Sequence, residues 1–76
     1  MYKHRERAKR WLEKAGKSKI DAFVQEAMLT DFDAKVCYLH KKDESYVKIA
    51  DKLNCDASTV GRSVARIYDA IFLLVL

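Results

Sequence analysis

The sequence predicts an all-α fold, a bundle of four to five helices that contains a helix-turn-helix. Apolar residues recur at spacings of three and four along most of the 76 residues, which is the period of an amphipathic helix. The chain has no proline, and residues that suit helix N-caps precede several of these stretches. The composition, 50% hydrophobic and 34% charged, is that of a compact chain, so we expect residues 1–76 to form one domain.

The first predicted helix covers residues 2–15, with Trp11 on a narrow apolar stripe and Gly16 placed to end it in a left-handed conformation. Residues 1–19 carry eight Lys or Arg against two Glu, whereas the rest of the chain carries seven basic and nine acidic residues. Concentrated positive charge favours a polyanionic partner. We therefore expect a basic N-terminal arm that reaches phosphates or the minor groove, made of Lys3, Arg5, Arg7, Lys9 and Arg10.

Capping motifs predict the next helices. Ser18 and Thr30 each stand three residues before an aspartate, which is the spacing of a capping box. The second helix is expected to run from the first of these caps to about Leu29, and the third helix to run from Thr30 to a polar connection. Either Asp43 or Ser45 in that connection can cap the fourth helix.

Residues 46–68 have the pattern of two helices joined by a tight turn. Asn54 tolerates a positive φ, and Asp56 is a suitable N-cap for the fifth helix, which runs from residue 57 towards the end of the chain. The inner faces of the two helices are predicted to be formed by Ile49, Ala50, Leu53, Val60, Val64 and Ile67.

The outer side of the fifth helix is polar and basic, as expected of a recognition helix in the major groove. Arg62 lies near its amino-terminal end, where a bidentate contact with guanine is favoured. Lys48 and Lys52 lie four residues apart on the fourth helix and suit contacts with phosphates. The predicted contacts with double-stranded DNA are Ser45, Lys48, Lys52, Ala57, Ser58, Thr59, Gly61, Arg62, Ser63 and Arg66.

The stretch from Leu29 to Ile71 resembles the carboxy-terminal DNA-binding region of bacterial sigma factors and related small helix-turn-helix regulators. The similar segments are LTDFDAKVCYLH, YVKIADKLN and STVGRSVARI, which belong to the third, fourth and fifth predicted helices. The resemblance implies a DNA-binding module linked to transcription, with major-groove contacts at Ala57, Ser58, Gly61 and Arg62. The chain departs from the family pattern in having asparagine for glycine in the turn. Its first 28 residues match no polymerase-binding region of sigma factors.

The apolar end of the last helix, residues 68–76, predicts a homodimer. A two-fold dimer would place two recognition helices about 34 Å apart, matching half-sites one helical turn apart. The predicted interface consists of Tyr68, Phe72, Leu73, Val75 and Leu76. Two alternatives remain open: a sigma-like interaction module that docks on RNA polymerase or another regulator, and the DNA-binding part of a recombinase or packaging machine.

Several classes of function are not expected. The histidines have no serine or cysteine nucleophile at a meaningful spacing, and there is no glycine-rich phosphate loop, so we expect neither an enzyme nor a cofactor. Cys37 and His40 lie three residues apart, but only Cys55 and the distant His4 could complete a zinc site, so no metal is expected. No apolar run reaches membrane-spanning length and no signal peptide is evident, so we expect a cytoplasmic protein without a membrane partner.

Overall fold

The computed structural model describes residues 2–76, with side chains described from Arg5 onward. Within that range it contains five α-helices and no strand, so the prediction of an all-α fold is confirmed. The helices are α1 (Tyr2–Lys14), α2 (Lys17–Glu26), α3 (Asp31–Lys41), α4 (Tyr46–Leu53) and α5 (Ala57–Leu74).

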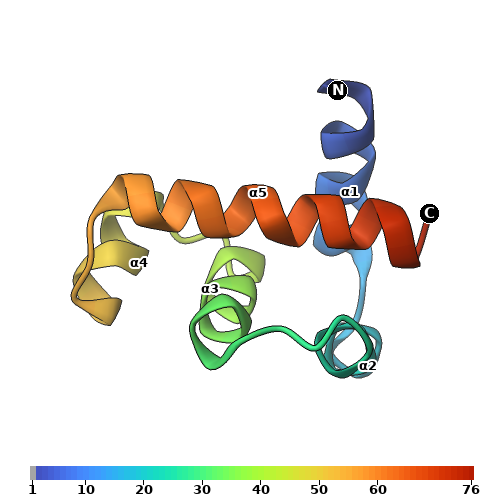
Figure 1. Ribbon diagram of the computed structural model, residues 1–76, viewed down its shortest axis with the longest axis horizontal. Helices are drawn as coiled ribbons and strands as arrows, with labels where there is room; N and C mark the ends of the chain where they lie inside the picture. Colours follow the sequence, from blue (N-terminus) through green and yellow to red (C-terminus); the bar gives the residue numbers. More distant parts are fainter. Residues whose placement is uncertain (1) are drawn as a thin grey trace.

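The long helix α5 organises the fold (Figure 1). At about 1.5 Å per residue its 18 residues extend about 27 Å, so it crosses most of the molecule. α4 packs near its amino-terminal end, α3 near its middle and α1 on its carboxy-terminal half. Its buried residues recur at spacings of three and four, which turns one face towards these helices: Val60, Ser63, Val64, Ile67, Tyr68 and Ile71.

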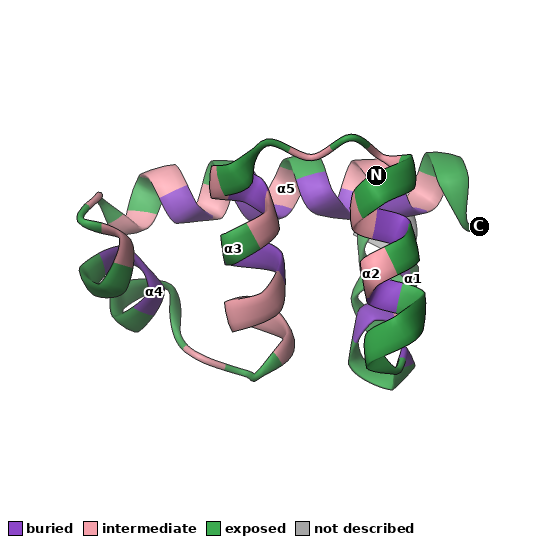
Figure 2. Cartoon of the chain, turned by 90° about the horizontal axis from the view of Figure 1, so that it is seen from below, coloured by how far each residue is buried: buried purple, intermediate pink, exposed green. Residues whose placement is uncertain are grey.

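The core is formed by the inward faces of all five helices (Figure 2). In α5 the buried positions lie on the face that meets α1 and α3, and the opposite face is exposed or half-buried. Trp11 of α1 packs edge-on against Phe23 of α2, with ring centroids 5.7 Å apart. The hydroxyl of Tyr38 donates to Asp21, which joins α3 to α2.

Two of the predicted N-caps are confirmed. The Thr30 hydroxyl accepts from the backbone N–H of Asp33 at 3.1 Å, and the Ser45 hydroxyl accepts from that of Lys48 at 3.3 Å. Asp56 occupies the N-cap position of α5 as predicted, but its side chain makes no capping hydrogen bond. Its backbone carbonyl accepts from the N–H groups of Thr59 and Val60 instead.

The junction between α1 and α2 differs from the prediction. Gly16 has φ −76° and ψ 172°, an extended conformation, so it does not end α1 in a left-handed conformation. It is the N-cap of α2, which begins at Lys17, and Ser18 lies inside the first turn and caps nothing. Because the second helix begins three residues after the first one ends, the linking backbone must already be extended, as an N-cap requires.

Three helices are followed, one or two residues after their last residue, by a residue in the left-handed conformation, and none of the three is glycine. These are Met28, Asp43 and Asn54, with φ values of 53°, 66° and 56°. After each, the next backbone N–H reaches back five residues to a helix carbonyl, as from Cys55 to Ala50 at 3.0 Å. The predicted role of Asn54 is confirmed. α2 ends at Glu26, earlier than predicted, and leaves Met28 86% exposed.

None of the described helices is both long enough and apolar enough to cross a membrane.

Candidate nucleic-acid interface

The helix pair α4–α5 has a short, well-defined connection. The turn comprises only residues 54–56, and the left-handed Asn54 reverses the chain between the helices. Ile49 and Ala50 of α4 share the buried core with residues of α5. Gly61 lies against Tyr46, because a Cβ at that position would be 3.7 Å from Cε2 of the tyrosine ring. The pair is therefore held on both sides of the turn.

The outer side of α5 begins with exposed polar residues. Ser58 and Arg62 are exposed, whereas Ala57, Thr59 and Gly61 are half-buried. Arg62 makes no hydrogen bond or ion pair with any other residue whose side chain is described. Its guanidinium is therefore available to a ligand one turn from the start of the helix.

The predicted phosphate contacts of α4 are accessible, although they are not equivalent. Lys48 is exposed and has no partner among the described side chains. Lys52 pairs with Glu44, with Nζ 2.7 Å from the carboxylate oxygen, so contact with a phosphate would compete with this ion pair. Ser45 is exposed, but its hydroxyl already accepts the capping hydrogen bond.

Ser63 and Arg66 belong to a network centred on Asp33 of α3. The Ser63 hydroxyl donates to Asp33 Oδ1 at 2.6 Å. Arg66 donates from Nε to Oδ2 at 3.1 Å and from Nη2 to Oδ1 at 2.9 Å. Ser63 is 0% exposed, so its prediction as a DNA contact is wrong: it lies at the edge of the buried stripe and faces α3. Arg66 is not a free cation, although 57% of its side chain is exposed.

The network makes the stability of the fold depend on pH. The Arg66 guanidinium lowers the pKa of Asp33 below its ordinary value, and the Ser63 hydroxyl adds to this against the opposing effect of burial. Because the folded pKa is depressed, the ionised carboxylate stabilises the fold above the unfolded pKa of about 3.9. That contribution is lost as pH falls through the folded pKa.

We therefore expect the difference in unfolding free energy between the wild type and Asp33→Asn to shrink as pH falls below about 4. Urea denaturation followed by circular dichroism between pH 7 and pH 2 measures it. A gap that stays constant over this range would show that ionisation of Asp33 contributes nothing to folding.

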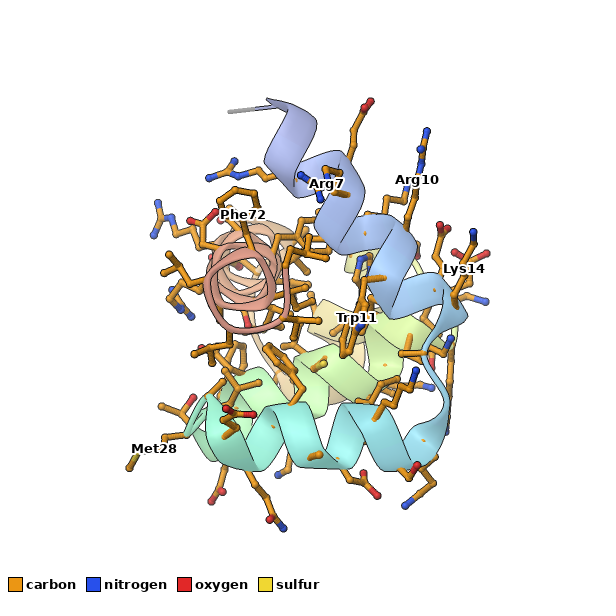
Figure 3. The ribbon with its side chains drawn as sticks, turned by 90° about the vertical axis from the view of Figure 1, so that its right-hand side faces the viewer. Arg7, Arg10, Trp11, Lys14, Met28 and Phe72 are labelled. Atoms are coloured by element: carbon orange, nitrogen blue, oxygen red, sulfur yellow. The ribbon has the colours of Figure 1, made fainter. Side chains whose placement is uncertain are left out.

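The basic N-terminal residues lie on a packed helix at the other end of α5 from α4 (Figure 1). Ala8 and Leu12 of α1 are buried, and Arg5 Nε lies 3.6 Å from Asp69 on α5. Figure 3 places Arg10 and Lys14 on the side of α1 away from α5. The predicted basic residues that are described are all exposed: Arg5, Arg7, Lys9 and Arg10. The side chain of Lys3 lies outside the described residues.

The apolar end of α5 is only partly available to a second copy. Tyr68 is 9% exposed and its hydroxyl lies 2.6 Å from His40 Nε2, so its assignment to a dimer interface is wrong. α3 supplies that partner, and burial raises the pKa of Tyr68 to about 12. Phe72 is half-buried. The exposed apolar residues form the C-terminal patch, which consists of Leu73, Leu74, Val75 and Leu76.

Gly61→Ala is expected to raise the free energy of unfolding by about 0.5–1 kcal/mol, because a glycine in a helix interior is less favourable than alanine. The added methyl group would meet the Tyr46 ring at 3.7 Å, an ordinary contact distance, so no steric penalty opposes the gain. Urea denaturation measures it. Gly16→Ala is the matched control, since at an N-cap alanine is no better than glycine. A loss of stability in Gly61→Ala would contradict the packing against Tyr46.

The cysteines and histidines do not gather into a metal site in the described part of the chain. Cys37 is buried in the core, and burial raises the pKa of its thiol to about 11. No cluster of three or more His, Cys, Asp or Glu that could hold a metal ion lies among the described residues. The side chain of His4 is outside that range.

Comparison of the chain with protein-family models, with curated proteins and with solved structures gave no match.

Proposed function

We propose that α4, the turn at residues 54–56 and α5 form a helix-turn-helix that binds double-stranded DNA in a sequence-specific manner, and that the protein regulates transcription. The observation that carries this proposal is the exposed, unpaired Arg62 near the amino-terminal end of α5, whose opposite face is buried. A recognition helix needs this combination, because it must be held rigidly from behind while its first turns enter the major groove.

The charges of the helix pair are compatible with DNA but give it a modest potential. Residues 46–68 carry four basic and two acidic residues. Asp51 and Asp56 are exposed near the turn, where they oppose the approach of phosphates, while Lys48 and Arg62 favour it. We therefore assign much of the non-specific attraction to the basic residues of α1, and sequence discrimination to α5.

The experiment that tests the proposal is selection of bound duplexes from a random pool, followed by fluorescence anisotropy on the selected sequence. Binding should weaken steeply between about 50 and 200 mM salt, because neutralising each phosphate releases condensed counterions. The selected sequence should compete better than a scrambled duplex of the same composition. Absence of binding to any duplex at low salt would refute the proposal.

The C-terminal patch supports a homodimer as part of this proposal. Its four consecutive apolar residues are exposed, Leu73 by 79%. Gly61 and Val75 are about 21 Å apart along the axis of α5. In a dimer whose two α5 helices meet end to end, the two segments around Gly61 that are proposed to contact DNA are therefore up to about 42 Å apart. A half-site spacing of about 34 Å then requires each helix to tilt by about 35° from the line joining them.

Leu73→Glu is expected to convert a dimer to a monomer, because two buried like charges at a two-fold interface repel each other and lose their hydration. Size-exclusion chromatography with light scattering at tens of micromolar measures this. Met28→Glu is the matched control, since Met28 is an exposed apolar residue outside the C-terminal patch. A monomeric wild type would contradict the homodimer and favour the patch as a docking surface for RNA polymerase or another regulator.

A further inference from the structure

The ion pair between Asp33 and Arg66 leaves one edge of the guanidinium open. The carboxylate engages the side of the arginine through Nε and Nη2. Both N–H groups of Nη1 and the second N–H of Nη2 remain as donors. One from each nitrogen points along the outer edge of the planar guanidinium, away from the chain, and the third points to the side of Cδ. None of them has a partner among the described residues. The outer edge can therefore engage a second pair of acceptors while the first pair stays in place.

Burial differs sharply between the two partners. The Asp33 side chain is almost fully buried, and its oxygens receive donors from Ser63 and Arg66 of the neighbouring helix. More than half of the Arg66 side chain is exposed on the outer side of α5. An arginine that served only to neutralise a buried carboxylate would gain nothing from leaving its second edge in solvent. The buried partner removes much of the rotamer freedom that a long side chain would otherwise lose on binding a ligand.

We propose that Asp33 is a positioning residue that aims Arg66 at a phosphate of the DNA backbone. This inference rests on the proposed function of the α4–α5 pair. It goes beyond that function because it assigns a role to a residue of α3 and changes the role of Arg66 from a free cation to a pre-oriented fork.

Phosphate is the expected acceptor because of where Arg66 lies along the helix. Arg62 is about 7–8 Å from the start of α5 and Arg66 about 13–14 Å. The first residues of a recognition helix contact base edges, and residues further along meet the sugar–phosphate backbone as the groove curves away. Two phosphate oxygens match the paired N–H groups of the outer edge in a bidentate contact. A guanine edge offers a similar pair of acceptors, so the test must distinguish the two.

The test is a double-mutant cycle on DNA affinity with Asp33→Asn, Arg66→Gln and the double variant. Each single variant breaks the charged pair, whereas the double variant can restore a neutral hydrogen-bonded pair between the two amides. Stability from urea denaturation and affinity from anisotropy are measured on the same preparations. Ser63→Ala is the matched control, because it removes a donor to the same carboxylate and leaves the Arg66 pair intact.

Asp33→Asn should bind the selected and the scrambled duplex about threefold to tenfold more weakly, to the same extent for both, while Ser63→Ala binds like the wild type. Arg66→Gln should reduce the slope of log affinity against log salt by about one. The double variant should recover stability but not affinity.

Three results would overturn the inference. If the wild type binds duplex and both single variants bind it with the same affinity as the wild type, the ion pair stabilises the fold and has no role in DNA binding. If the double variant recovers affinity together with stability, Asp33 acts through folding and not by orienting Arg66. If Arg66→Gln weakens only the selected duplex, Arg66 contacts a base. If the wild type binds no duplex, the proposed function itself is refuted. That result differs from the three above, all of which require a wild type that binds DNA.

Discussion

Ile67→Ala is expected to lower the free energy of unfolding by about 2–5 kcal/mol, which is a large part of the stability of a folded chain of 76 residues. Ile67 is completely buried in the middle of α5. Truncation removes apolar burial in the middle of the face that α5 turns towards the other helices, and a long helix cannot easily collapse into the resulting cavity. Urea denaturation followed by circular dichroism measures the loss, which should lower the transition midpoint without changing the slope.

Leu73→Ala provides the control in the same helix. Leu73 is exposed, so its truncation should change the free energy of unfolding of the protomer by no more than about 0.5 kcal/mol. If the two variants were equally stable, the packing of α5 against α1 and α3 would be wrong. Measurements at low protein concentration are needed, because dissociation of a dimer would add to the effect at Leu73.

The expected loss at Ile67 matters for function because α5 has two roles. Its inner face carries six buried residues, five of them in the hydrophobic core, and its outer face carries the proposed DNA contacts. A destabilised core would therefore weaken DNA binding without any change in the contact residues, and added duplex would raise the stability of such a variant by mass action. Loss of binding in a variant is informative about a contact only when its folded population has been measured.

Local features of this fold could be predicted from the sequence. The caps at Thr30 and Ser45 and the left-handed Asn54 were identifiable because each depends on the chemistry of a few neighbouring residues. The start of α5 and the buried stripe that includes Val60 and Ile67 follow from helical periodicity. The capping motif at Ser18 was misleading, because Gly16, two residues earlier, provides an extended backbone on which the helix begins.

Contacts between distant residues could not be predicted from the sequence. In the sequence Asp33 forms part of a capping motif with Thr30. In the structure its carboxylate accepts hydrogen bonds from Ser63 and Arg66, which lie at least 30 positions further along the chain. Serine at the edge of an apolar stripe is equally compatible with an outer and an inner position, and only the carboxylate of α3 decides the matter for Ser63. The sequence likewise places Tyr68 on an apolar face without a partner, because its partner His40 lies on another helix.

These distant contacts change how the candidate interface is organised. Ser63 does not belong to the interface, because it is buried against Asp33, and Arg66 is hydrogen-bonded to the same carboxylate. Arg62 is therefore the one arginine of the described α5 without a protein partner. The basic side chains of α1 lie beside the other end of the helix, where Arg5 meets Asp69. Attraction and discrimination are therefore assigned to different parts of the molecule, and they should respond differently to substitution.

Arg62→Ala is expected to reduce discrimination between the selected and the scrambled duplex by about 1–3 kcal/mol, roughly a fivefold to 150-fold change in the ratio of affinities. The physical reason is that a bidentate contact with a base edge is lost only on the correct sequence, while the scrambled duplex never made it. Arg62 has no described protein partner, so its removal should leave folding unchanged, which circular dichroism verifies. Anisotropy competition at one fixed salt concentration measures the ratio.

Lys48→Ala is the control that distinguishes loss of a base contact from loss of a phosphate contact. Lys48 is also exposed and unpaired among the described side chains, but it lies on α4, where phosphate contact is proposed. Its removal should weaken both duplexes to a similar extent and leave their ratio unchanged. If Arg62→Ala behaved like Lys48→Ala, Arg62 would be a phosphate contact and some other residue of α5 would read the sequence. If neither variant changed any affinity, the DNA surface would have to lie away from the α4–α5 pair.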